Sequence, residues 1–410
     1  MVFDDIIKSV WMKWKREIQF FKTFLNMNFF CLQHKFVFFN KLMISIGIIA
    51  ISLLLFSCNN NENTKIPEPA PPQIKKPEKK PELDSFITIK YHTIKFTSNS
   101  ERKAFFADIA KKPNFNPGIM KLLNRKEWYL IQNSNTVIYP DTFITDLRAY
   151  SFFPVYYSEA ANIPKLILVS TKYQAAAFYE NGNLKRFAAV NSGKERTQTY
   201  PGRYQLNFRQ RTRLSSIDST WEMNYYFNFN AEAGMAFHQF FMPGYPASHS
   251  CMRMFEEDAK WLYSWGKAAK YDSLHRPIQN TGTPVIILDH YQFGTLYRPW
   301  LELASNKDPK LKLPQKPLEC DEPLIPISQI PKEVRGSLRN ISRYKIAEDS
   351  LRKLGIIREG ITITPSVNFN KLRRIKKMQE LEKQKELEKQ KEIENINNTT
   401  IPEENIQQIN

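Results

Sequence analysis

Strand-like segments follow one another at short intervals between residues 164 and 290 of this 410-residue chain. They are rich in apolar and aromatic residues and occupy 165–170, 175–180, 184–190, 199–206, 221–229 and 282–288. Asn181-Gly182 joins the second segment to the third, and this dipeptide is a strong hairpin signal because both residues accept positive φ. We therefore expect a mainly β domain over 164–290.

One helix is predicted inside this β region. The acidic run Glu256-Glu257-Asp258 suits a first helical turn, where negative side chains interact favourably with the helix dipole. Ala259, Leu262 and Trp265 follow at helical spacing and give the helix an apolar face. We therefore interpret the three acids as structural rather than as a carboxylate site.

The amino end contains an uncharged apolar run at 42–56, with Lys35 and Lys41 before it. A membrane span needs about 20 residues, so a run of fifteen is typical of a signal-peptide core. It ends in Leu55-Phe56-Ser57-Cys58, which resembles a bacterial lipobox. The resemblance implies that 1–57 is a leader with a lipoprotein signal peptide and that Cys58 is lipidated. An uncleaved signal anchor is the alternative.

Two readings of the first 26 residues stay open. A start at Met27 instead of Met1 would leave an ordinary basic, apolar leader. In the second interpretation, the segment before Met27 forms an amphipathic helix on a membrane surface. It contains Trp11, Trp14 and several lysines.

The composition divides the rest of the chain into further segments. Residues 59–84 are rich in Pro, Lys and Glu, with few apolar residues to bury, and predict a disordered tether. Residues 371–410 form a charged tail that is helical or disordered, with i,i+3 pairs such as Glu382–Lys385. Its apolar residues recur every six positions, which disfavours a coiled coil.

Two segments flank the β domain. Residues 85–163 form a small N-terminal module of unknown type, with helical parts between Phe105 and Lys121 and a strand over 128–140. Residues 291–370 form an extension that we expect to pack on the β domain, with a helix over 344–354.

The net charge of +18 lies mostly in the body of the chain, outside the leader, the linker and the tail. A basic excess suits nucleic acid, anionic wall polymers or lipid head groups. The basic residues form no nucleic-acid-binding motif, so we expect anionic surroundings in the cell envelope and no nucleic acid.

The strongest chemical signal is a cysteine close to a histidine. Cys251 follows His238 by thirteen residues, and the turn-forming Pro243-Gly244-Tyr245-Pro246 between them can fold the chain back. A thiol attacks as its thiolate, and an imidazole commonly takes its proton. The spacing therefore predicts a nucleophilic cysteine site.

Cys251 and the two nearby histidines also allow two other interpretations. A free cysteine is most often a small buried hydrophobe. His238, His249 and Cys251 could also ligate zinc, but His249 and Cys251 are too close in sequence for the usual ligand spacing, and no second pair completes a set. We therefore predict no metal site.

The sequence around Cys251 resembles the active-site signature of the L,D-transpeptidase (YkuD-like) family. That signature is a histidine, a short variable loop, Ser/Thr-His-Gly-Cys, an aliphatic residue, and Arg or Asn. The string Pro-Gly-Tyr-Pro-Ala-Ser-His at 243–249 is common within the family. The order of strands, the helix and the closing Gly-Thr-Pro-Val at 282–285 support the resemblance.

The resemblance implies roles for the matched residues. Cys251 would be the nucleophile and His238 the proton acceptor and donor. The supporting residues would be Ser248, His249 and Ser250, which line the oxyanion site, and Arg253, which holds the loop or a substrate carboxylate. Ser250 stands where the family has glycine, and glycine before a nucleophile indicates positive φ or close backbone approach.

The fold implied is a β-sandwich-like L,D-transpeptidase domain with an adjacent helix, flanked by small α/β segments and disordered ends. The function implied is a peptidoglycan L,D-transpeptidase that forms 3→3 crosslinks, or attaches another amine, through a cysteine acyl-enzyme without a cofactor. Its partners would be peptidoglycan stem peptides and, through the lipid anchor, a membrane. Such a periplasm-facing lipoprotein would act in cell wall biogenesis and cell shape.

Two alternatives accompany this function. One is a wall-peptide L,D-carboxypeptidase or endopeptidase on the same fold, and the other is a catalytically silent wall-binding lipoprotein tether. The cysteines do not suggest a disulfide framework, because Cys31 lies in the leader, Cys58 is the lipidation site, Cys251 is the nucleophile and Cys320 is left over.

Overall fold

The computed structural model describes residues 87–338 and 340–399. The predicted leader, the predicted lipidation site Cys58, the linker over 59–84 and the end of the tail lie outside the described residues. None of the helices in the described part of the chain has the length and apolar character required to span a bilayer.

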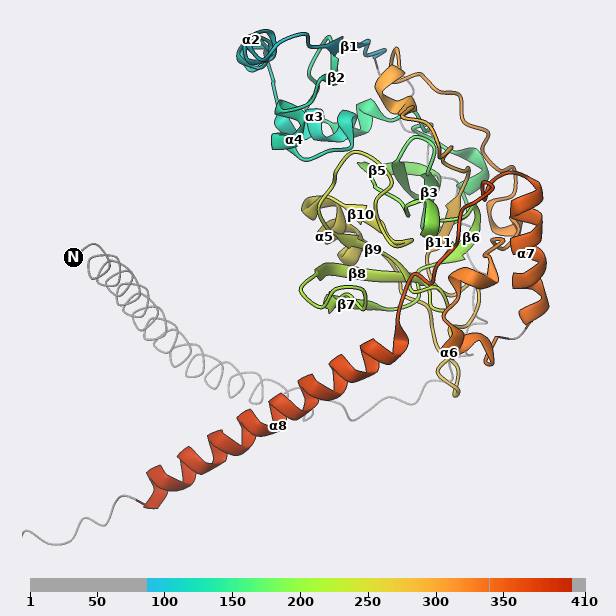
Figure 1. Cartoon of the computed structure of the whole chain (residues 1–410). Coiled ribbons are helices and arrows are strands. Elements are labelled where there is room, and N and C mark those ends of the chain that lie inside the picture. The colour runs from blue at the N-terminus through green and yellow to red at the C-terminus, as the bar shows by residue number, and fades with distance from the viewer. Residues whose placement is uncertain (1–86, 339, 400–410) are drawn as a thin grey trace, which may run out of the picture. The chain divides into compact units, whose positions relative to one another are not determined.

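The strands are β1 (Tyr91–Lys95), β2 (Thr136–Pro140), β3 (Leu166–Ser170), β4 (Ala175–Glu180), β5 (Asn183–Ala189), β6 (Gly202–Gln205), β7 (Arg209–Leu214), β8 (Glu222–Asn230), β9 (Met235–Gln239), β10 (Met252–Met254) and β11 (Pro284–Ile287). The α-helices are α2 (Asn99–Ile109), α3 (Pro117–Asn124), α4 (Trp128–Gln132), α5 (Glu256–Trp265), α6 (Lys332–Arg335), α7 (Ile341–Lys353) and α8 (Phe369–Thr399). Figure 1 shows their arrangement.

The strands between residues 166 and 287 form two sheets. The five-stranded sheet has the order β5-β4-β3-β11-β6, and the four-stranded sheet has the order β10-β9-β8-β7. Most neighbouring strands are antiparallel, but β3 and β11 are parallel to each other, as are β9 and β10. The parallel pair β9-β10 places the two ends of the motif, His238 and Arg253, side by side.

The core between the sheets explains the continuous apolar run in β3. Ile167 and Val169 face the core shared with Phe227 and Phe237 of the other sheet. Leu166 and Leu168 belong to a second core, which includes the N-terminal module. A strand buried on both faces needs apolar residues at every position, so the absence of alternation is the expected consequence.

Helix α5 lies against the four-stranded sheet and buries Ala259 and Leu262. Its first turn contains the three predicted acids, and Asp258 forms a 2.6 Å ion pair with Arg186 of β5. The mainly β, sandwich-like fold with an adjacent helix is therefore confirmed.

The N-terminal module pairs β1 with β2 in antiparallel register and places α2, α3 and α4 between them in sequence. The predicted strand over 128–140 is partly wrong, because Trp128–Gln132 is the short helix α4 and only Thr136–Pro140 is extended. The apolar run Trp128 to Ile131 fits either structure, and short apolar runs do not separate helix from strand by pattern alone.

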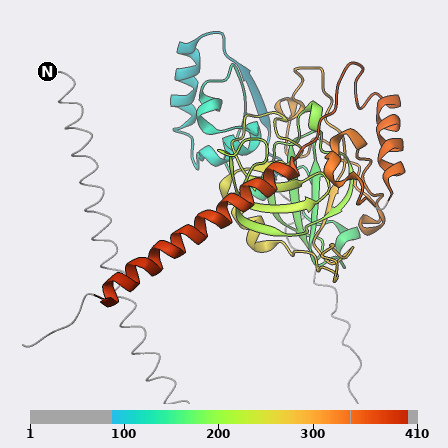
Figure 2. The ribbon, with the colours of Figure 1, turned by 60° about the horizontal axis from the view of Figure 1, so that its bottom comes forward.

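The C-terminal extension packs on the sandwich. Leu351 of α7, with Ile357 and Ile363 after it, lies in the core between the sheets. The chain then returns to the four-stranded sheet and continues as α8 (Figure 2). Beyond its first turns α8 is mostly exposed, which agrees with its charged composition.

Candidate active site

The strand pair β9-β10 places Cys251 next to His238. His238 lies on β9, and Arg253 of β10 is its partner in the parallel register. Cys251 comes directly before β10 and packs against Ala236 of β9. The loop containing Pro243-Gly244-Tyr245-Pro246 connects the two strands, so the predicted return of the chain is confirmed.

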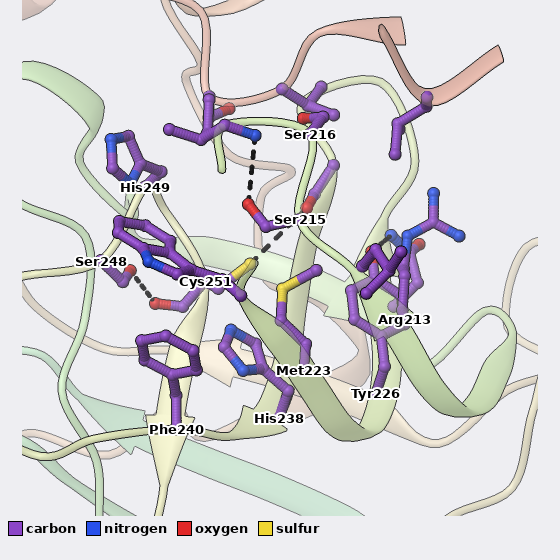
Figure 3. A pocket seen from close by; sticks show the side chains of 18 of the residues that line it. Arg213, Ser215, Ser216, Met223, Tyr226, His238, Phe240, Ser248, His249 and Cys251 are labelled. Carbon is purple, nitrogen blue, oxygen red and sulfur yellow. Dashed lines mark hydrogen bonds between the residues drawn. The ribbon is translucent and has the colours of Figure 1, made fainter. Parts of the chain in front are cut away.

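Cys251 and His238 line one cavity of about 180 Å³. Ser248, His249 and Arg253, which the motif also singled out, line the same cavity. Figure 3 shows the His238 ring beside the sulfur of Cys251 and the His249 ring farther from it.

The His238 ring is held in one tautomer. Its Nδ1 lies 3.0 Å from the carbonyl oxygen of Gln239, and a carbonyl can only accept, so Nδ1 carries the hydrogen. The other ring nitrogen, Nε2, is then the proton acceptor. Tyr226 stacks on the ring at 6.4 Å between centroids, and Phe240 packs edge-on at 5.9 Å.

Burial keeps both reacting groups neutral at rest. Burial lowers the pKa of His238 to about 4 and raises the pKa of the Cys251 thiol to about 11. The Ala236 N–H and the guanidinium groups of Arg253 and Arg213 oppose the rise in the thiol pKa but do not cancel it. At neutral pH the Cys251 thiol is therefore protonated, and the His238 imidazole is uncharged.

The thiol has a defined partner in the resting site. Its Sγ donates to the carbonyl oxygen of Gly234 at a distance of 3.7 Å. Gly234 lies in the turn between β8 and β9, on the side of the cavity that the C-terminal extension contacts.

Ser250 occupies the backbone conformation that the family's glycine suggests. Its φ is +73°, in the left-handed region that residues with a Cβ rarely adopt. Its Oγ is buried and has no hydrogen-bond partner among the described residues. Serine thus keeps the shape of the turn before Cys251, at a cost in backbone strain and in an unsatisfied hydroxyl.

Close packing fixes the position of this turn. A Cβ added to Gly193 would lie 2.8 Å from the Cα of Ser250, so the two backbones are in direct contact. Thr199 Oγ1 donates to the Ser250 carbonyl at 3.0 Å, and the N–H of Lys194 donates to the Ser248 carbonyl at 2.9 Å. The segment from Gly193 to Thr199 therefore holds the loop that carries the thiol.

Ser248 and His249 support the loop in different ways. Ser248 is buried, and its Oγ donates a short hydrogen bond to the carbonyl oxygen of Cys251, which closes the turn. His249 Nε2 lies 2.9 Å from the Lys194 Nζ, and its ring packs near Trp221 at 6.1 Å between centroids. Burial, followed by the charges of Lys194 and Arg253, lowers the pKa of His249 to about 4.

Arg253 ties the cysteine strand to the loop after β9. Its Nη1 donates to the Phe241 carbonyl at 3.2 Å, and its guanidinium lies 4.7 Å from the centroid of the Phe240 ring. Its backbone exchanges two hydrogen bonds with Asn191, of 2.9 and 3.0 Å. Among the residues that line the cavity there is no carboxylate, so the positive charge of Arg253 has no counterion there.

Sequence reasoning missed several residues of the cavity. They are Arg213, Trp221, Met223 and Tyr226 on or beside β7 and β8. Arg209, Arg211 and Arg213 alternate in the sequence, as expected for one face of a strand. From this alternation the strand β7 could have been predicted. The alternation does not indicate that Arg213 lies near Cys251.

Comparisons with known proteins concern the segment that contains this site. Residues 164–287 match the family model of the L,D-transpeptidase catalytic domain. The match confirms the resemblance for this part of the chain. No curated protein matches the chain.

Solved L,D-transpeptidases are also similar to part of the chain. One from Stackebrandtia nassauensis is 21% identical, covers 32% of this chain and 58% of its own, and has a TM-score of 0.26. One from Xylanimonas cellulosilytica is 25% identical, with 30% and 59% covered and a TM-score of 0.24. One from Mycobacterium smegmatis is 15% identical, with 31% and 59% covered and a TM-score of 0.25. The chain thus spans less than two thirds of each solved chain.

Proposed function

We propose that this protein is a cysteine-dependent peptidoglycan L,D-transpeptidase. The observation that carries the proposal is the placement of Cys251 and His238 on one cavity, inside the segment that matches the L,D-transpeptidase catalytic domain. The tautomer of His238 supports the same role, because it leaves Nε2 free to accept the thiol proton.

The reaction proceeds in two acyl transfers. The Cys251 sulfur attacks the carbonyl between the third residue of a tetrapeptide stem and its terminal D-alanine, and His238 takes the thiol proton. The carbon–nitrogen bond then breaks, His238 gives the proton to the leaving D-alanine amine, and a thioester remains on Cys251. The side-chain amine of a neighbouring stem attacks the thioester, which forms the 3→3 amide and returns the proton to sulfur.

Developing charge is stabilised at two places. The tetrahedral oxyanion is held by backbone N–H groups of the turn at Ser250 and Cys251, where each well-placed donor contributes about 3 kcal/mol. Arg213 and Arg253 make the cavity positive, and the cavity lining contains no carboxylate. This electrostatic environment suits a stem peptide, which carries carboxylates, and it favours Arg253 as a group that binds one of them.

The proposal includes an export route. Cys58 would be the lipidated first residue of the mature protein, and residues 59–84 would tether the catalytic domain in the periplasm-facing envelope. Both lie outside the described residues and depend on the sequence alone. Labelling cells with an alkyne fatty acid tests the anchor, because the label should attach to the wild type and not to Cys58→Ala.

Product analysis tests the proposed reaction. The purified full chain is incubated with disaccharide-tetrapeptide, and the products are identified by mass spectrometry. We expect dimers that have lost one D-alanine, and no dimers with Cys251→Ala. Tripeptide stems without dimers would instead identify a carboxypeptidase. Cleavage of a crosslinked dimer, supplied in a separate incubation, would identify an endopeptidase.

The silent-tether alternative has a specific structural counterargument. Ser250 keeps the left-handed backbone conformation that a glycine would adopt, so the turn before the nucleophile is retained. A wild-type protein that forms no product and no acyl-enzyme would nevertheless show that the tether interpretation is the right one.

A further inference from the structure

A short segment of the C-terminal extension forms part of the cavity that contains Cys251. Ser366, Val367, Phe369 and Leu372 all line it, although they follow Cys251 by more than one hundred residues. We call residues 366–372 the strap. It enters from the extension and runs into the first turn of α8. Figure 2 shows this end of α8 against the strands of the four-stranded sheet.

Three hydrogen bonds attach the strap to two sides of the cavity. On one side, the Ser366 Oγ donates to the Ala233 carbonyl at 2.6 Å. On the other side, the Asn368 N–H donates to the Ser216 Oγ at 2.9 Å, and the Lys371 Nζ donates to the Ile217 carbonyl at 3.1 Å. The strap therefore bridges the turn after β8 and the loop after β7.

The strap also lies against the hydrogen-bond partner of the nucleophile. The Cys251 thiol donates to the carbonyl oxygen of Gly234. A Cβ added to Gly234 would lie 3.0 Å from the Val367 side chain, so Val367 packs directly on this residue. The strap thus contacts the resting environment of the thiol as well as the rim of the cavity.

The remaining space is small. A cavity of about 180 Å³ lies below the range of about 300–1,000 Å³ that is usual for small-molecule sites. A peptide stem is larger than such a ligand. The cavity with the strap in place is therefore better matched to a small reagent than to a peptide-sized or bulky one.

We propose that the strap is a size-selective gate, in which Phe369 and Leu372 decide what reaches Cys251. Both side chains are only half-buried. The strap is otherwise held by the Val367–Gly234 contact and by a few hydrogen bonds. Segments held by few buried contacts open locally at a lower cost than global unfolding. The strap is therefore suited to open while the sandwich stays folded.

Thiol alkylation tests the gate without relying on transpeptidation. The full chain is treated at pH 9 with iodoacetamide, which is small, or with a maleimide that carries a bulky aromatic group. Modification of Cys251 is followed by mass spectrometry of the peptide that contains it. Cys320 is a partly exposed free cysteine and serves as an internal reference.

The variants are Phe369→Ala and Leu372→Ala, with Leu381→Ala as the matched control. Leu381 lies on the same helix but is exposed. For the two strap variants we expect the bulky reagent to modify Cys251 at least about fivefold faster, which corresponds to about 1 kcal/mol in the opening equilibrium. The iodoacetamide rate should change by less than about twofold, and Leu381→Ala should behave as the wild type does.

Three results would overturn the gate. In the first, both reagents modify Cys251 faster by the same factor in the strap variants, which indicates general loosening of the site. In the second, the modification rates do not change in either strap variant. In the third, neither reagent modifies Cys251 in any variant. None of these results depends on peptidoglycan. The gate can therefore be present in a protein without transpeptidase activity, in which case only the proposed function fails. Transpeptidase activity without size selection would mean that only the gate fails.

Discussion

The Nε2 atom of His249 lies 2.9 Å from the Nζ atom of Lys194. The lysine has only donors, so the neutral imidazole must accept through this nitrogen. The Nε2 of His249 is therefore engaged, whereas the structure leaves the Nε2 of His238 as an acceptor beside the thiol. The two histidines of the motif thus differ in their availability for proton transfer.

Replacing the two histidines separately tests this difference. We expect His238→Gln to lower kcat/KM by about 10²–10⁴-fold, as is usual for the loss of a general acid–base group. His249→Gln should have a smaller effect, because it removes a contact to Lys194 and leaves the proton acceptor in place. Steady-state rates on disaccharide-tetrapeptide measure both. A severe loss in His249→Gln with a nearly normal His238→Gln would exchange the roles.

The pH dependence should follow the low pKa of His238. A protonated imidazole cannot accept the thiol proton, and burial lowers the pKa of His238 to about 4. The rate of acylation should therefore stay level from neutral pH down to about pH 5 and fall only as the pH approaches 4. Single-turnover acylation measures this, with far-UV circular dichroism at each pH to show that the protein is still folded. A midpoint near 6.5 would contradict the neutral pair.

Covalent labelling identifies the nucleophile. A carbapenem resembles the acylating substrate of the family, and it should add once to the wild type and not to Cys251→Ala. Cys320→Ala is the matched control, because Cys320 is also free and should not affect the adduct. Mass spectrometry of the intact protein and of its peptides locates the adduct. An adduct on Cys320, or one that persists in Cys251→Ala, would refute the assignment.

Ser250→Gly should stabilise the protein. Glycine removes the left-handed strain at φ +73°, which costs about 1–2 kcal/mol per residue, and it removes the unpartnered hydroxyl. Part of this gain is lost because glycine adds freedom to the unfolded chain. We expect a net gain of about 1 kcal/mol in the free energy of unfolding, and a change in kcat/KM of less than about tenfold. Urea denaturation and steady-state rates measure the two.

Ser250→Ala separates the two contributions to this effect. Alanine keeps the Cβ and the backbone strain but lacks the unpartnered hydroxyl. It should therefore recover only the part of the stabilisation that comes from the hydroxyl. A Ser250→Gly protein less stable than the wild type would show that the left-handed conformation carries little strain here.

Much of the sandwich could be predicted because its signals are local. The apolar run of β3, the Asn181-Gly182 turn and the acidic first turn of α5 each determine structure within a few residues. The motif around Cys251 is also local, which explains why its members line one cavity. Trp128–Gln132 shows the limit, because a short apolar run has no period that distinguishes a helix from a strand.

The residues that sequence reasoning missed depend on contacts between distant segments. Arg213 lines the cavity because β7 and β8 pair in a particular register. Val367 lines the cavity because the C-terminal extension returns to the four-stranded sheet. Such placements follow from tertiary packing, and no pattern within either segment contains them. The positive φ of Ser250 was anticipated only through comparison with the glycine of the family signature.

The protonated state of the buried thiol has a consequence for the lifetime of the protein. With a pKa of about 11, only about one Cys251 in ten thousand is ionised at pH 7. Peroxides attack the thiolate, and the sulfinic and sulfonic products that follow are irreversible. In the proposed mechanism Cys251 ionises only as it reacts with substrate, so the thiol is protected from this damage between turnovers. We therefore expect Cys251 to resist peroxide far longer than an exposed cysteine of low pKa would at the same peroxide concentration.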